Sequence, residues 1–180
     1  MNILFSGGSK SGKSELAENA ALSLAGDGGR LYYIATMIPR DDEDLQRIRR
    51  HRGARAGKGF ITVECGGDIN KLADDADPEG TYLLDSVTAL LESVAFDDEY
   101  KYRDSAADEI TSSLKRLSRA VKDLVLVSDN IFSDGGSYDT ETEKYRKGLA
   151  ACGRRLAEIS DTVCEVTCKI PMLFKGELPL

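Results

Sequence analysis

The chain has 180 residues, of which 41% are hydrophobic and 31% charged, a composition typical of one globular domain and not of a disordered chain. Its formal net charge of −7 argues against nonspecific nucleic-acid binding, which needs a basic surface. No apolar run is long enough to span a bilayer, and the N-terminus lacks the basic start of a signal peptide. We therefore expect one cytoplasmic domain over residues 1–180, with neither nucleic acid nor a membrane as its partner.

Short apolar runs alternate with amphipathic segments along the chain. The predicted strands are residues 2–6, 31–35, 60–64, 81–84, 124–127 and 162–167. The predicted helices are residues 13–24, 41–50, 68–76, 87–96, 104–122 and 140–159. Residues 129–138 are rich in Gly, Ser and Asp and are predicted to form a loop, and an apolar tail follows residue 167. This alternation predicts an α/β fold of the P-loop NTPase type, with a mostly parallel sheet, helices on both faces and ligands at the carboxyl ends of the strands.

A phosphate-binding motif follows the first predicted strand. It reads Gly7-Gly8-Ser9-Lys10-Ser11-Gly12-Lys13-Ser14 and matches G-x-x-x-x-G-K-S, the Walker A motif or P-loop. The glycines allow backbone N–H groups to surround phosphate oxygens, Lys13 is expected to reach the β- and γ-phosphates, and Ser14 to bind Mg²⁺. Because the motif stands between a strand and a helix, it predicts binding of a purine nucleoside triphosphate.

Asp85 is the candidate second ligand of Mg²⁺. It ends the apolar run Tyr82-Leu83-Leu84, where P-loop proteins carry a metal-binding acid. An Asp before a helix is also a good N-cap, but Ser86 can serve as the cap instead. We therefore favour the metal role for Asp85.

His51 is the one histidine of the chain and stands in a basic run with Arg47, Arg49, Arg50, Arg52 and Arg55. One interpretation is a solvated basic end of a helix, where cations suit the helix dipole. The other is a nucleophile, with an imidazole nitrogen that attacks an α-phosphate while arginines neutralise the phosphates. The spacing of these residues leaves both interpretations open.

The chain resembles the bifunctional adenosylcobinamide kinase / adenosylcobinamide-phosphate guanylyltransferase family of cobalamin biosynthesis. The matching positions occur in the same order as in the family: residues 6–14, Ala17-Glu18, residues 33–36, Asp42-Glu43, Arg47-Ile48, His51, Arg55, Glu64-Cys65, residues 83–85 and the Pro171 to Gly176 tail. The P-loop is shared by many enzymes, whereas the Tyr33-Ile34-Ala35-Thr36 strand followed by a segment bearing His51 is more specific. This resemblance favours the nucleophile interpretation of His51.

The resemblance implies a P-loop α/β fold, compact homotrimers and two reactions. ATP or GTP phosphorylates adenosylcobinamide, and GTP then donates GMP through a guanylylated histidine, His51, to adenosylcobinamide phosphate. Lys13 and His51 are the expected catalytic residues, Ser14 and Asp85 the expected Mg²⁺ ligands. The expected nucleotide-binding residues are Gly7, Gly8, Ser9, Lys10, Ser11, Gly12, Lys13, Ser14, Tyr33, Ala35, Thr36, Arg47, Arg55, Glu64 and Asp85, and Arg146 is a further candidate to hold phosphate.

The second half of the chain departs from the family pattern. The family's N-E-V-G-x-G-I-V-P loop is replaced by residues 129–137, and its N-Q pair by Gly153-Arg154. Two alternatives stay open. One is a small-molecule P-loop kinase without the covalent guanylyl step, in which His51 is an ordinary residue. The other, which the changed loop suggests, is a nucleotide-binding paralogue without catalysis.

Overall fold

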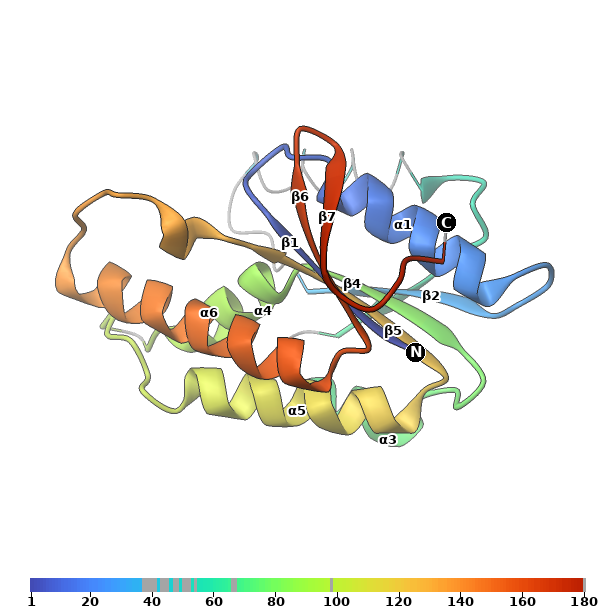
Figure 1. The fold of residues 1–180 in the computed structure, drawn as a ribbon. Helices are drawn as coiled ribbons and strands as arrows, with labels where there is room; N and C mark the ends of the chain where they lie inside the picture. Colours follow the sequence, from blue (N-terminus) through green and yellow to red (C-terminus); the bar gives the residue numbers. More distant parts are fainter. Residues whose placement is uncertain are drawn as a thin grey trace.

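A computed structural model describes residues 1–36, 42, 46, 49, 53, 55–65, 68–97 and 99–179. A seven-stranded sheet in the order β3-β2-β4-β5-β1-β6-β7 runs through the molecule (Figure 1). All neighbouring strands are parallel except β6 and β7, which form an antiparallel pair at one edge. The strands are β1 (Asn2–Gly7), β2 (Leu31–Ala35), β3 (Ile61–Glu64), β4 (Thr81–Asp85), β5 (Asp123–Asp129), β6 (Thr162–Thr167) and β7 (Ile170–Lys175).

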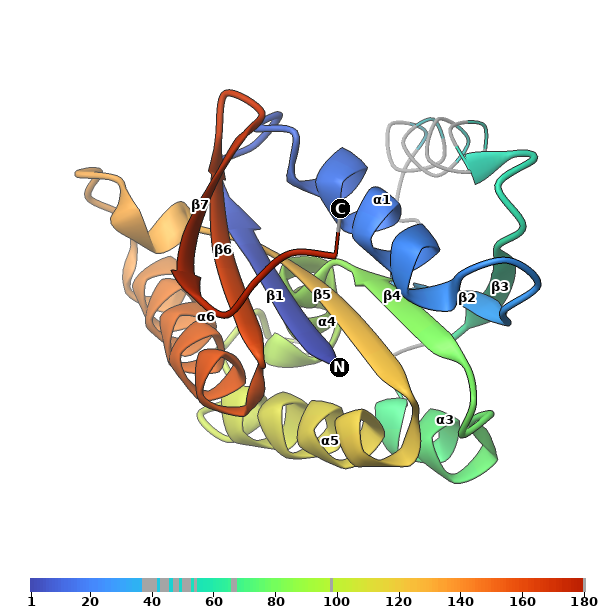
Figure 2. The same cartoon turned by 45° about the vertical axis from the view of Figure 1, so that its right-hand side comes forward.

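Helices lie on both faces of this sheet, as the alternating sequence pattern predicts (Figures 1 and 2). On one face lies α1 (Lys13–Ala25), and on the other lie α3 (Ile69–Asp75), α4 (Val87–Ala95), α5 (Ala106–Ala120) and α6 (Thr140–Ile159). A short 3₁₀ helix, η1 (Ile131–Ser133), follows β5. None of the described helices has the length and apolarity that a membrane crossing would need. The helix predicted at residues 41–50 falls mostly outside the described residues.

The central strands separate two apolar cores because successive side chains of a strand point to opposite faces. In β1, Ile3 and Phe5 pack with α1, whereas Leu4 packs with the helices of the other face. In β5, Val125 and Val127 likewise belong to the first core, and its leucines to the second. A sheet buried on both faces explains why β1, β4 and β5 read as unbroken apolar runs.

Two parts of the fold differ from the sequence prediction. The predicted loop at residues 129–138 begins too early, since β5 continues to Asp129 and pairs there with Gly7 of β1. The apolar tail contains a strand, β7, that the sequence analysis missed. The chain reverses before β7 through Cys168 and Lys169, both with positive φ, and this left-handed turn carries neither the Gly nor the Asn that marks such turns in a sequence.

A candidate active site at the carboxyl edge of the sheet

The P-loop connects β1 to α1 at the carboxyl edge of the sheet. Gly12 adopts a left-handed conformation, with φ 98°, and serves as the N-cap of α1. A Cβ at Gly7 would lie 2.5 Å from the carbonyl oxygen of Val166, so the β1–β6 pairing leaves room only for glycine there. The N-terminus of α1 follows directly, and its unpaired N–H groups make it a site for phosphate.

Lys13 is buried, with 9% of its side chain exposed. Its ammonium donates a hydrogen bond to the carbonyl oxygen of Gly8 at 3.0 Å. Its Nζ also lies 2.6 Å from Oδ1 of Asp129, the last residue of β5. Asp129 is not among the site residues predicted from the sequence, although an acid at the end of an apolar strand is the same signal that singled out Asp85.

The β6–β7 hairpin lies against the P-loop. The Lys169 N–H donates to the carbonyl oxygen of Ser11 at 2.7 Å, and its ammonium lies 2.8 Å from Glu15 in the first turn of α1. A Cβ at Gly12 would lie 2.7 Å from Cγ of Lys169. The hairpin therefore restricts the P-loop from outside, and no local sequence signal predicts this contact across more than 150 residues.

Asp85 ends β4, as predicted, and its side chain is half-buried. Ser86 caps α4 by accepting the Ala89 N–H at 3.2 Å, so Asp85 is not needed as the cap. Ser14 stands in the first turn of α1. A hydroxyl and a carboxylate are hard oxygen donors of the type that Mg²⁺ prefers, so these two residues fit the ion.

A second group of predicted residues lies at the ends of β2 and β3. Tyr33 and Ala35 are in β2, Thr36 follows it, and Glu64 ends β3. The Tyr33 hydroxyl donates to the carbonyl oxygen of Asp85 at 3.0 Å, and Thr36 donates to the carbonyl oxygen of Ser86. Burial, together with the Asp85 carboxylate, raises the pKa of Tyr33 above its ordinary value, so Tyr33 remains a neutral donor.

Arg55 belongs to this second group. Its guanidinium carbon lies 3.3 Å from the centre of the Tyr33 ring, a cation–π contact, and the residue is only 7% exposed. Its Nη1 atom is buried without a hydrogen-bond partner among the described residues. A buried guanidinium N–H without a partner suits an anionic ligand such as a phosphate. Arg47 and His51 lie outside the described residues.

The two groups occupy different parts of the same edge. Four strand spacings separate β1 from β3 in the order β3-β2-β4-β5-β1, or about 19 Å. Glu64 and the P-loop therefore cannot contact the same phosphate group. Asp85, on β4, lies between the two groups, and strand order separates residues that the sequence predicts as one nucleotide-binding set.

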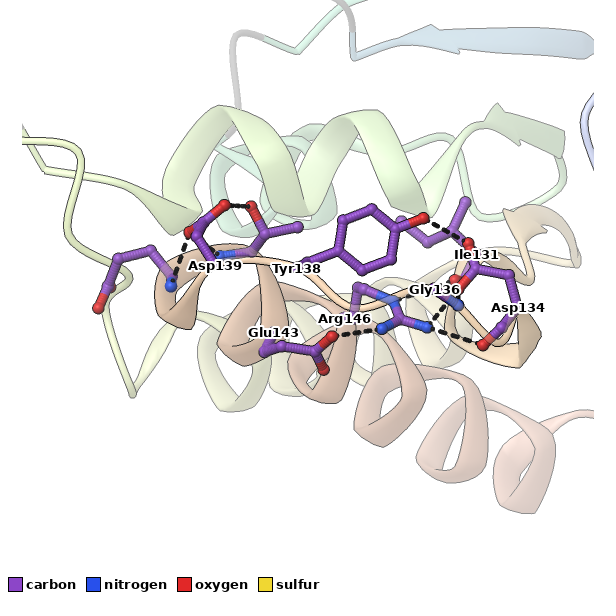
Figure 3. Close-up of polar contacts among 9 residues, drawn as sticks. Ile131, Asp134, Gly136, Tyr138, Asp139, Glu143 and Arg146 are labelled. Atoms are coloured by element: carbon purple, nitrogen blue, oxygen red, sulfur yellow. Dashed lines mark hydrogen bonds and ion pairs between the residues drawn. The ribbon is translucent and has the colours of Figure 1, made fainter.

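Arg146, a candidate to hold phosphate in the sequence analysis, contacts residues of the protein instead. The residue is only 8% exposed. Its guanidinium donates a hydrogen bond to the carbonyl oxygen of Ile131 at 3.2 Å (Figure 3). It also forms ion pairs with Asp134 and Glu143, each at 2.6 Å, and so holds the segment after β5. Its guanidinium also lies 4.6 Å from the ring centre of Tyr138. The Tyr138 hydroxyl donates to Asp134 and holds the pKa of that carboxyl below its ordinary value. Arg146 thus orders the loop, and a role in holding phosphate stays a prediction.

The parallel sheet, the glycine-rich turn and the buried lysine together define a protein of the P-loop NTPase class. The family model described as cobinamide kinase / cobinamide phosphate guanyltransferase matches residues 3–174, and the chain belongs to this family. The match covers both groups of residues at the carboxyl edge.

Curated relatives agree with this assignment. The bifunctional adenosylcobalamin biosynthesis protein CobU of Escherichia coli (strain K12) is 34% identical over 142 residues, which span 73% of this chain and 76% of that protein. The protein of the same name from Salmonella typhimurium (strain LT2) is 29% identical over 186 residues, covering 97% of this chain and 100% of that protein. Among solved structures, an ATPase domain matches with a TM-score of 0.52 and 13% identity over 91% of this chain and 68% of that one, a likeness of fold alone.

The contact between Gly12 and Lys169 can be tested by Gly12→Ala. The new methyl group strains a left-handed residue and collides with Lys169, so we expect GTP affinity to fall at least about tenfold, because the P-loop N–H groups shift. Isothermal titration calorimetry measures this. Gly28→Ala is the matched control, since Gly28 also has a positive φ but open space around it, and should keep wild-type affinity. Equal affinity of the Gly12 variant and wild type would contradict the hairpin restraint.

The loop contacts of Arg146 can be tested by Arg146→Ala. Without the guanidinium, two carboxylates and two carbonyl oxygens lose the donor that they share. We therefore expect the amide hydrogens of residues 131–138 to exchange at least about tenfold faster, and a protease to cut this segment at least about tenfold faster. Arg154→Ala, an exposed arginine of the same helix, is the control and should leave these rates unchanged. Wild-type protection in the Arg146 variant would show that the loop does not depend on this side chain.

Proposed function

We propose that the chain phosphorylates adenosylcobinamide with ATP or GTP, and then transfers GMP from GTP to adenosylcobinamide phosphate to give adenosylcobinamide-GDP. The observation that carries this proposal is the family match over residues 3–174 combined with a P-loop whose buried lysine contacts a strand-end carboxylate, that of Asp129. We further propose that residues 1–180 act as one kinase and guanylyltransferase domain.

In the first reaction, the P-loop residues 7–14 hold the triphosphate. Backbone N–H groups and Lys13 bind and neutralise the β- and γ-phosphates, and Ser14 and Asp85 hold Mg²⁺. When bound, the ion neutralises charge on the phosphate oxygens. The hydroxyl of adenosylcobinamide attacks the γ-phosphorus, and the nucleoside diphosphate leaves. Positioning and charge neutralisation supply most of the catalysis in reactions of this kind.

In the second reaction, His51 is the proposed nucleophile. Its imidazole nitrogen attacks the α-phosphorus of GTP, and pyrophosphate leaves. A phosphate oxygen of adenosylcobinamide phosphate then attacks the same phosphorus and releases the histidine. The proposed contacts for this nucleotide are Arg47, Arg55, Tyr33, Ala35, Thr36 and Glu64. The Nη1 atom of Arg55, which has no hydrogen-bond partner within the part of the chain that the structure describes, supports a phosphate at the end of β2.

We also propose a homotrimer in the cytoplasm. Strand β7, at the edge of the sheet, exposes Ile170, Met172, Leu173 and Phe174, with exposed fractions of 45–69%. An apolar edge strand of this kind favours association with further copies of the chain. The four cysteines are free thiols, which suits a reducing compartment.

The covalent step is tested by incubating the protein with GTP labelled at the α-phosphate. We expect an acid-labile label on the wild type and none on His51→Ala or His51→Asn, while both variants still transfer γ-phosphate to adenosylcobinamide because the P-loop is intact. Electrophoresis and product separation measure the two activities. A label that persists in the variants would exclude His51 as the nucleophile. Phosphorylation without any label would favour the kinase alternative, and tight GTP binding without either reaction would favour the non-catalytic one.

The trimer is tested by Phe174→Asp, which places a charge on the exposed apolar edge. Analytical ultracentrifugation should give a trimer for the wild type and a monomer for the variant, because a buried unpaired carboxylate disfavours association. Ile61→Asp is the control, since Ile61 is 52% exposed on β3 at the opposite edge, and it should remain trimeric. A monomeric wild type would refute the proposed assembly.

A further inference from the structure

A carboxylate of α1 is buried near the second group of site residues. Glu18 is only 7% exposed and stands one helical turn after Ser14, so both side chains lie on the same face of α1. From the P-loop, α1 crosses the sheet toward β2, and its alanines share an apolar core with Tyr33 (Figure 2). Glu18 matches the family sequence, yet neither proposed reaction uses it directly. A buried carboxylate in this place needs a positive partner.

Lys58 provides this partner from the segment that precedes β3. Its Nζ atom lies 2.5 Å from Oε2 of Glu18. Gly57 and Gly59 stand on either side of Lys58, both with positive φ and with open space around them, so neighbouring side chains do not restrain the backbone of this turn. The ion pair therefore joins the turn to α1.

Two further contacts join the same segment to Tyr33 of β2. The guanidinium carbon of Arg55 lies 3.3 Å from the centre of the Tyr33 ring. Phe60 packs edge-on against that ring, with 6.4 Å between the ring centres. The Lys58 N–H donates to the carbonyl oxygen of Arg55 at 3.1 Å. Residues 55–60 thus contact β2 at both ends and α1 in the middle, so a shift of Lys58 displaces Arg55.

The charges at the end of β2 suit an arginine that is held in place by a distant acid. Burial is the main cause that raises the pKa of Tyr33, and the carboxylates of Asp85 and Glu18 add to the increase, which places the charge of Glu18 near this ring. The Nη1 atom of Arg55 is buried and has no hydrogen-bond partner within the described part of the chain. Since Glu18 pairs with Lys58, this N–H stays available to a phosphate oxygen.

We propose that Glu18 is a positioning residue for guanylyl transfer, and that through Lys58 it holds Arg55 against the α-phosphate of GTP. This role rests on the second reaction of the proposed function, and Glu18 touches neither the nucleotide nor the reacting atoms. The first reaction takes place at the P-loop on β1, about three strand spacings from β2, and does not need Arg55. Loss of the ion pair should therefore slow the second reaction and spare the first.

The test is Glu18→Gln in the full chain, which keeps the size of the side chain and removes its charge. With saturating GTP labelled at the α-phosphate, we expect the protein to be labelled about 10- to 100-fold more slowly, because a displaced arginine no longer meets the phosphate in the geometry of attack. Phosphorylation of adenosylcobinamide should stay close to the wild-type rate. Asp74→Asn is the control, since it breaks an exposed ion pair with Arg116 on the opposite face of the sheet, and it should leave both rates unchanged.

Variants of Lys58 separate positioning from a general loss of structure. Lys58→Gln should slow labelling as much as Glu18→Gln does, and the double variant should lose no more than either single variant, since all three remove the same contact. Lys58→Arg, which keeps the ion pair, should retain most of the labelling rate. Three outcomes would overturn the proposal: unchanged labelling in either single variant, equal loss of both reactions in Glu18→Gln, or losses that add in the double variant.

A measurement without substrate separates this proposal from the proposed function. If the wild type takes no label from GTP, the second reaction fails by itself, and hydrogen exchange then tests the positioning alone. The Lys58 N–H should exchange at least about tenfold faster in Glu18→Gln than in the wild type, because the turn loses its contact with α1. Equal exchange rates would refute the role of Glu18.

Discussion

The parallel pairing of β1 with β5 on one side and β6 on the other is the interaction on which the site depends. It places Gly7 opposite Asp129 and beside Val166, and it leaves no space for a side chain where the P-loop begins. Because parallel strands end at the same edge, the same pairing brings the strand-end acids and the start of α1 together. The backbone hydrogen bonds of the sheet thus determine which side chains can meet.

The P-loop lies between two contacts of different kinds. From β5 it receives a half-buried ion pair, in which Asp129 satisfies the charge of Lys13. Removing either partner leaves an uncompensated charge, whereas bound phosphates supply the lysine with new negative partners. From the β6–β7 hairpin it receives a backbone hydrogen bond and steric contact at Gly12. The first contact must rearrange when nucleotide binds, and the second can persist.

The residues of the candidate site extend along the sheet edge, and this separation gives two reactions room within one small fold. The P-loop lies at β1, and Tyr33, which contacts Arg55, lies on β2, about three strand spacings away. A triphosphate at the P-loop and a second anionic group near Arg55 can therefore occupy the edge together. The loop held by Arg146 follows Asp129 directly, so it borders the P-loop end of this edge.

The sequence by itself determined the layered fold, most element positions and the P-loop, because strand alternation, helical periodicity and the spacing of Gly12, Lys13 and Ser14 are local properties of the chain. It also predicted that Asp85 ends a strand, and an acid at that position lies at the carboxyl edge of a parallel sheet. Tertiary structure alone decided that Lys13 pairs with Asp129 and that Lys169 packs on Gly12. These contacts join residues more than 100 positions apart, and their partners are selected by strand order and by a left-handed turn that the local residue types do not encode.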